Sequence, residues 1–120
     1  MTIIINPERI IKEIQKEFNE EFPYLKIEFF NKGIRYKPTR KRDQSLSKDL
    51  KLGNVNMLDF RDDLKISGTM TVKELEKIFE DRLGLSVLVY RKSGNLWLEP
   101  TMTDNWTLEQ QNENGRQISG

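Results

Sequence analysis

The chain repeats itself, and this repeat limits its fold more than any other feature of the sequence. When the sequence is shifted by 61 positions, its first half aligns with its second half without a gap, from a helical pattern through the hairpin that follows. The identical pairs are Lys12–Lys73, Glu13–Glu74, Lys16–Lys77, Phe18–Phe79, Gly33–Gly94 and Asp43–Asp104.

Agreement in residue class supports the repeat better than identity does, because two charged helices share Lys and Glu by chance. The pairs are Ile11–Val72, Ile14–Leu75, Phe22–Leu83, Ile27–Leu88, Phe29–Tyr90 and Tyr36–Trp97. Beyond the hairpin the offset changes by one residue, where Ser45 meets Thr107. We interpret the pattern as an internal duplication; the alternative is that two ordinary β-α-β segments have converged on similar sequences.

The repeat predicts an α+β fold made of two β-α-β-β-α units. The first unit covers residues 1–53, the connector residues 54–63 and the second unit residues 64–120. We expect antiparallel-rich sheets with the helices packed on one face. Two independent domains of this size would have marginal cores, so one cooperative body is the preferred arrangement.

In the first unit, a β-branched run predicts a strand over residues 2–5. Asn6 then offers a capping oxygen and Pro7 a suitable φ, so we expect a helix to begin there. Its apolar residues recur at steps of three and four, and Pro23 ends it. A strand over residues 25–30, a turn at Gly33 and a returning strand over residues 34–37 complete the hairpin.

In the second unit, Thr71 and Glu74 form a capping box and Gly84 suits the left-handed end of the helix. Strands are expected over residues 86–91 and 96–99, joined by a turn. Short helices are expected near Ser45 and Thr107. Gly53 and Gly115 limit both to about two turns, and residues 112–120 are expected to fray.

Several classes of chemistry are excluded by composition. The chain has no Cys and no His, which rules out thiolate metal sites, cysteine nucleophiles and every triad that depends on His. The acidic residues Glu17, Glu20 and Glu21 fit a solvent-facing helix surface, and those of the connector, Asp59, Asp62 and Asp63, lack the spacing of a calcium loop. We therefore expect no catalytic site, no metal and no cofactor.

Charge is unevenly distributed although the net charge is only +1. Residues 32–51 hold eight Lys or Arg against Asp43 and Asp49, a local charge of +6. Cations beside an aromatic ring on a strand and loop can follow a nucleic-acid backbone and stack a base. The candidate contacts are Arg35, Tyr36, Lys37, Arg40, Lys41 and Arg42. The alternative is that an acidic helix of the same chain neutralises this block.

Two tryptophans of the second unit form the other candidate site. Trp97 lies on a hairpin strand and Trp106 just before the last helix. Tryptophan is enriched where protein surfaces bind each other, although both rings can also cover a small core. Trp97 and Trp106 are therefore candidates for a partner-binding surface, with covering of the core as the favoured role of Trp97.

The segment of residues 71–94, together with Asp104-Asn-Trp-Thr-Leu108, resembles a family of small, uncharacterised bacterial α+β proteins known mainly from structural genomics. The resemblance covers about half of the chain. It implies a β-α-β-β-α unit that is often repeated, and it brings no catalytic residue. The basic residues Arg40, Lys41 and Arg42 have no counterpart in this pattern.

Together these features predict a cytoplasmic, non-enzymatic binding module whose partner is another protein. The N-terminus lacks the basic stretch of a secretory signal, and no apolar run is long enough to span a membrane. The alternative function is non-specific nucleic-acid binding through residues 35–42. Retention on heparin that disappears when Arg40, Lys41 and Arg42 become Glu would favour that alternative. A third candidate function is that of a carboxylate-based hydrolase, which would require two acidic groups that face one cleft.

Overall fold

The computed structural model describes residues 2–31, 46–55 and 63–119. These residues form an α+β fold with two antiparallel sheets, which confirms the prediction of an α+β fold rich in antiparallel pairing. The elements, in order, are β1 (Ile3–Ile5), α1 (Ile11–Glu21), β2 (Leu25–Asn31), α2 (Leu52–Val55), β3 (Leu64–Ile66), α3 (Val72–Ile78), the π-helical turn η2 (Phe79–Leu83), β4 (Leu85–Ser93), β5 (Leu96–Leu98), the 3-10 turn η3 (Thr101–Thr103) and α4 (Leu108–Ser119).

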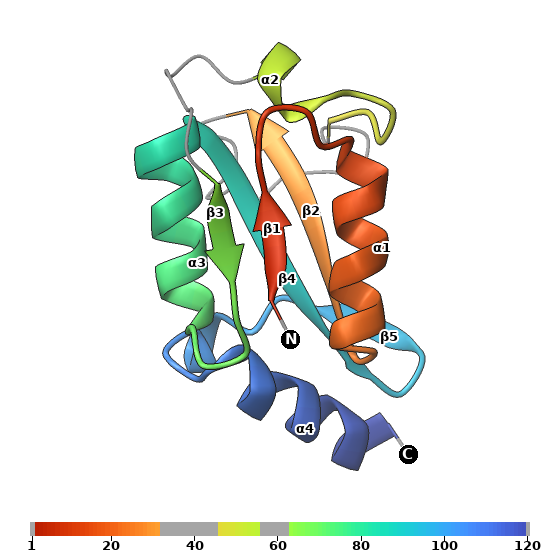
Figure 1. The fold of residues 1–120 in the computed structure, drawn as a ribbon. Coiled ribbons are helices and arrows are strands. Elements are labelled where there is room, and N and C mark those ends of the chain that lie inside the picture. The colour runs from red at the N-terminus through yellow and green to blue at the C-terminus, as the bar shows by residue number, and fades with distance from the viewer. Residues whose placement is uncertain (1, 32–45, 56–62, 120) are drawn as a thin grey trace.

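Strands of the first half pair with strands of the second half. β1 pairs with β3, with Ile4 opposite Lys65. β2 pairs with β4 over seven residues, from Leu25 opposite Arg91 to Asn31 opposite Leu85, and β5 pairs with the other side of β4. In Figure 1, α1 and α3 stand on either side of the β1–β3 ribbon, in front of the three-stranded sheet, and α4 crosses below.

The core lies between the helices, the ribbon and one face of the larger sheet. The apolar side of α1 and that of α3 and η2 face it, and Phe18 and Phe79 are both fully buried. The rings of Phe29 and Phe79 meet edge to face at 5.6 Å between centroids, which joins β2 of the first half to η2 of the second. Burial of each such side chain contributes about 2 kcal/mol to folding.

The second long helix begins and ends as predicted. The Thr71 hydroxyl accepts a hydrogen bond from the Glu74 amide at 3.0 Å, and the Glu74 carboxylate accepts one from the Thr71 amide at 3.1 Å. The helical segment continues through η2 and ends at Gly84, which has the left-handed conformation with a φ of 69°.

The prediction that the first helix begins at Asn6 and Pro7 is wrong, because α1 begins at Ile11. The Asn6 side chain accepts a hydrogen bond from the Glu8 amide at 3.0 Å, which forms a local turn instead of a helix cap. Ile10 stays extended and forms a β-bridge with Lys51. This tertiary contact delays the start of the helix.

The predictions for the short helices are partly wrong. α4 begins after Thr107, as expected, but it runs through Gly115 to Ser119, so residues 112–119 are helical and not frayed. In the first half, the residues after Leu46 form turns, and the short helix α2 begins only at Leu52. The predicted strand over residues 34–37 and most of the connector lie outside the described residues.

The two halves make corresponding backbone hydrogen bonds at the helix starts. The Ile11 amide donates to the Leu50 carbonyl at 2.9 Å, and the Val72 amide donates to the Trp106 carbonyl at 3.2 Å. Three further amide-to-carbonyl bonds of the first half have a counterpart in the second. They are Lys12 to Lys48 (counterpart Lys73 to Asp104), Leu52 to Arg9 (counterpart Leu108 to Met70) and Gly53 to Pro7 (counterpart Glu109 to Gly68). Leu50 thus corresponds to Trp106 and Lys51 to Thr107, which corrects the alignment of Ser45 with Thr107.

Candidate functional site

The candidate nucleic-acid contacts Arg35, Tyr36, Lys37, Arg40, Lys41 and Arg42 all lie outside the described residues. Their prediction therefore stays a prediction. The same holds for Asp59 and Asp62 of the connector, whereas Asp63 is described and exposed.

Trp97 lies on the face of the larger sheet that is turned away from the helices. Its register partner is Lys92, and its ring takes part in a cation–π contact with Lys26 of β2, whose ammonium lies 5.2 Å from the ring centroid. The same ammonium lies 5.3 Å from the ring centroid of Tyr90. The ring is therefore half-buried beside a cation of this chain, not freely offered to a partner.

Trp106 lies on a different part of the surface, at the turn that leads into α4. Its amide donates to the Thr103 carbonyl at 3.0 Å, and its carbonyl accepts from the Val72 amide. Its side chain is 36% exposed. No contact given by the described residues joins Trp97 to Trp106, so the structure does not bring the two predicted residues into one site.

The structure instead exposes apolar side chains that sequence reasoning missed. Leu96 is 64% exposed and Leu98 46% exposed on β5, Met102 is 93% exposed on η3, and Ile118 is 47% exposed near the end of α4. Together with Trp106 they are the exposed large apolar residues of the described C-terminal segment, and we refer to the group Leu96, Leu98, Met102, Trp106 and Ile118 as the β5–α4 surface. The signal was present in the sequence, because a strand Leu-Trp-Leu places its two leucines on the face opposite to its tryptophan.

The register of the β4–β5 hairpin turns Leu96 and Leu98 toward α4. Leu98 lies opposite Arg91, whose guanidinium donates to the buried Gln111 side chain of α4 at 2.8 Å. Residues that lie opposite each other in an antiparallel pair have their side chains on the same face. The two leucines therefore project on the α4 side of the sheet.

α4 is attached to the rest of the fold by the fully buried Leu108 at its start and by polar contacts along its length. The Gln111 side chain donates to the Thr103 hydroxyl at 3.0 Å, and Asn112 accepts from the Tyr24 amide at 2.8 Å. At the end of the helix, the Ser119 hydroxyl donates to the Lys92 carbonyl at 3.0 Å and accepts from the Gly94 amide at 3.1 Å. These bonds hold the end of α4 next to the turn that leads into β5.

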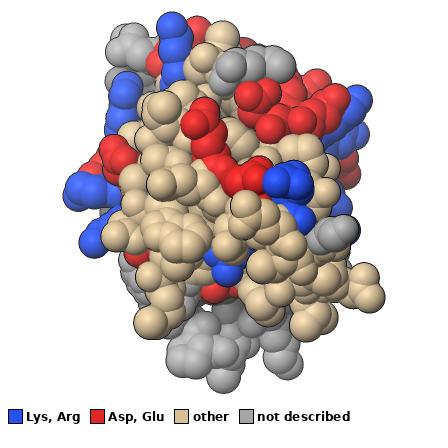
Figure 2. Space-filling view, turned by 90° about the horizontal axis from the view of Figure 1, so that it is seen from below, with Lys and Arg blue, Asp and Glu red and all other residues tan. Residues whose placement is uncertain are grey.

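Uncharged atoms cover much of this side of the molecule. Seen from below, they surround a group of acidic and basic side chains near the middle of the view, and further charged atoms lie toward the sides and the top (Figure 2). On α4, Glu113 forms an ion pair with Arg116, with Arg116 Nε donating to a carboxylate oxygen at 3.0 Å. This hydrogen bond lowers the pKa of Glu113 and raises that of Arg116, so both groups stay charged and neutralise each other at neutral pH.

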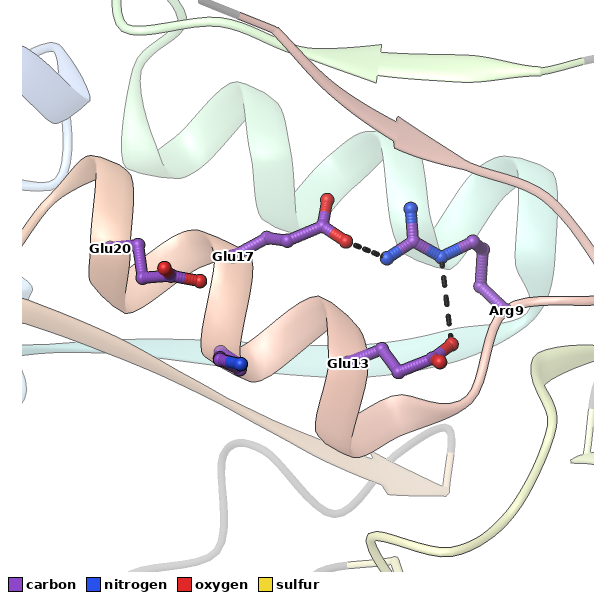
Figure 3. A pocket seen from close by; sticks show the side chains of 5 residues that line it. Arg9, Glu13, Glu17 and Glu20 are labelled. Atoms are coloured by element: carbon purple, nitrogen blue, oxygen red, sulfur yellow. Dashed lines mark hydrogen bonds and ion pairs between the residues drawn. The ribbon is translucent and has the colours of Figure 1, made fainter.

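An open hollow of about 430 Å³ beside α1 is lined by Arg9, Glu13, Lys16, Glu17 and Glu20. Figure 3 shows the carboxylates of Glu13 and Glu17 turned toward the Arg9 guanidinium. Arg9 also donates to the Ile4 carbonyl at 3.1 Å. Since its central cation is already satisfied by groups of this chain, the hollow does not indicate a ligand.

Within the part of the chain that the structure describes, no group of three or more acidic residues is placed to hold a metal ion. None of the described helices has the length and apolar character needed to cross a membrane. Comparison of the chain with protein-family models, with curated proteins and with solved structures finds no match.

Proposed function

We propose that this protein is a non-enzymatic binding module and that its partner is another protein. The observation that carries the proposal is the distribution of exposed apolar side chains among the described residues. Of the large ones, only Ile4 lies outside the C-terminal segment; the others are the five residues of the β5–α4 surface.

An apolar surface of this kind favours association. Each Å² of apolar surface removed from water contributes about 25 cal/mol, and large contiguous apolar patches on soluble proteins mark interaction sites. Uncharged atoms cover much of the side seen from below, although acidic and basic groups lie near the middle of that view (Figure 2). Among the described residues, exposed apolar side chains fit a protein partner better than a nucleic acid, whose phosphates require cations.

We also propose that the two halves arose by internal duplication and fold as one body. The corresponding hydrogen bonds at Ile11 and Val72 support the first part, because four donor–acceptor pairs of one half recur in the other. The pairing of β2 with β4 supports the second, since the larger sheet needs a strand from each half.

The binding proposal can be tested by selecting peptides from a displayed random library on immobilised protein. The test variants are the double variant Leu96→Lys with Leu98→Lys and the single variant Trp106→Lys. The matched control is Ile4→Lys, which places the same charge at a similarly exposed apolar position on β1.

We expect selected peptides to lose at least tenfold in affinity for both test variants and to bind the control as tightly as the unmodified protein. Binding that ignores both test variants, or that Ile4→Lys weakens equally, would assign recognition to another surface. Selection of no peptide at all would count against a peptide-binding function.

A further inference from the structure

We infer that the partner of β5 is a second copy of this chain, joined through antiparallel pairing of β5 with β5 about a twofold axis at Trp97. The inference rests on the proposed function and identifies the partner of part of the β5–α4 surface. The pairing would join two three-stranded sheets into one.

β5 is the edge strand of its sheet. The sheet has the order β2-β4-β5, and no strand among the described residues pairs with the free side of β5. The hairpin closes with Ser93 opposite Leu96 around a two-residue turn, and Gly94 has a φ of 62°, as the first position of a type II′ turn requires.

This geometry determines which backbone groups face outward. The closing pair of a two-residue hairpin exchanges both of its hydrogen bonds, and antiparallel pairs alternate along the ladder. Trp97, the next residue, therefore directs its N–H and its C=O away from β4. A residue that presents one donor and one acceptor can pair with its own copy. With a twofold axis at Trp97, the N–H of each Trp97 donates to the C=O of the other, so both groups of both copies are satisfied.

The side chains fit the same axis. With Trp97 opposite Trp97 of the other copy, each Leu96 lies opposite a Leu98, so four leucines meet on the α4 side of the joined sheet. These leucines are exposed in the single chain, at 64% and 46%. Pairing would remove them from water without burying a charge of β5, since the strand reads Leu-Trp-Leu.

Most of the features that protect natural edge strands are absent from β5. Natural edges are kept short, or carry lysine, proline, bulges or inward-pointing charges. β5 is short, with three residues, but it has no lysine, proline or charged side chain, and the first proline comes only at Pro100. Most soluble oligomers are closed twofold dimers, and a symmetric edge contact of this kind forms one dimer and then stops.

Analytical ultracentrifugation tests whether the dimer exists. We expect the weight-average mass to rise with concentration from that of one chain, 14.2 kDa, toward twice that value. The double variant Leu96→Lys with Leu98→Lys should remain monomeric at the highest concentration, whereas Ile4→Lys should dimerise like the unmodified protein. Circular dichroism would establish that each variant is folded.

Disulfide cross-linking tests the register of β5 against β5. Because the chain has no cysteine of its own, only the introduced cysteines can form disulfides. In the proposed dimer, residues 96 and 98 of opposite copies form a pair without mutual hydrogen bonds, about 4.5 Å apart at Cα, a separation that a disulfide spans. An equal mixture of Leu96→Cys and Leu98→Cys proteins should therefore cross-link mainly between the two variants. A mixture of Leu96→Cys with Met102→Cys, also highly exposed, should give no such preference.

The results separate this inference from the proposed function. A chain that stays monomeric, a dimer that survives the double lysine variant, species larger than a dimer, or cross-linking with no preference for the 96–98 pair would each overturn the inference. If one of these outcomes is found but the double lysine variant still loses affinity for the selected peptides, the proposed binding function holds and the partner is not a second copy of this chain. If the dimer forms as described and no peptide binds, the function is self-association alone.

Discussion

At the scale of single residues, the two halves have different kinds of contact at corresponding positions beside α1 and α3. Arg9 and Glu17 form a hydrogen-bonded ion pair beside α1, with the Arg9 side chain only 20% exposed. Their counterparts 61 positions later are Met70 and Ile78, which pack against the core as partly buried apolar residues. A charged contact in one half thus stands where the other half has an apolar one.

This difference predicts the outcome of an exchange. Replacing only Glu17 by Ile should lower the free energy of unfolding by about 1 kcal/mol, because Arg9 loses its closest partner while it stays largely buried. The double variant Arg9→Met with Glu17→Ile should recover that loss, since an apolar pair of suitable size can replace a partly buried ion pair. Chemical denaturation in a double-mutant cycle gives both values.

A matched control is the exposed ion pair of Lys77 with Asp81, at 3.2 Å. Lys77→Ala should change the free energy of unfolding by no more than about 0.5 kcal/mol, because solvent screens exposed pairs. A double variant at positions 9 and 17 that is less stable than either single variant would show that the two halves are not interchangeable here.

At the scale of elements, the sequence predicted those helix ends that depend only on residues nearby in the chain. The capping box of Thr71 and Glu74 and the left-handed Gly84 were predicted because each needs only neighbours in the chain. The start of α1 at Ile11 was not predictable in this way. It depends on a bridge from Ile10 to Lys51, which lies far away in the sequence.

The same reasoning explains the error at Gly115 and the missed site. Glycine usually ends helices, but Gly115 lies inside α4 because the helix passes close to the loop before β2 there. The tryptophans were predicted from their residue type alone. The exposure of Leu96 and Leu98 depends on which face of β5 the other elements do not cover. Only the fold supplies that information.

Gly115 gives the prediction for this scale. A Cβ at this position would lie 2.8 Å from the Cβ of Tyr24 and 3.2 Å from the Cγ of Arg91. Gly115→Ala should therefore lower the free energy of unfolding by about 1–3 kcal/mol, although alanine favours a helix by about 1 kcal/mol over glycine. Gln117→Ala, on the exposed side of α4, is the matched control and should have almost no effect.

Hydrogen exchange would locate the effect of Gly115→Ala. We expect reduced amide protection in α4 and unchanged protection in α1, because the strained contact lies under α4. Increased stability of the variant would mean that α4 can shift away from Tyr24 at little cost, and that its docking is looser than its polar contacts indicate.

At the scale of the whole molecule, pairing across the halves decides how the chain unfolds. β1 of the first half pairs with β3 of the second, and β2 pairs with β4 over seven residues. Phe29 of the first half also contacts Phe79 of the second. If one half unfolds, the other loses strand partners and part of its core, so a stable half-folded state is not expected.

The two tryptophans make this expectation measurable in the intact chain, because both lie in the second half. Phe18→Ala leaves a cavity in the first half and should cost about 3–5 kcal/mol. If the halves unfold together, tryptophan fluorescence and far-ultraviolet circular dichroism will show the same loss of stability for Phe18→Ala as for Phe79→Ala. A tryptophan transition that Phe18→Ala leaves unchanged, while circular dichroism splits into two steps, would mean that each half is stable without the other and that the shared sheet contributes little to stability.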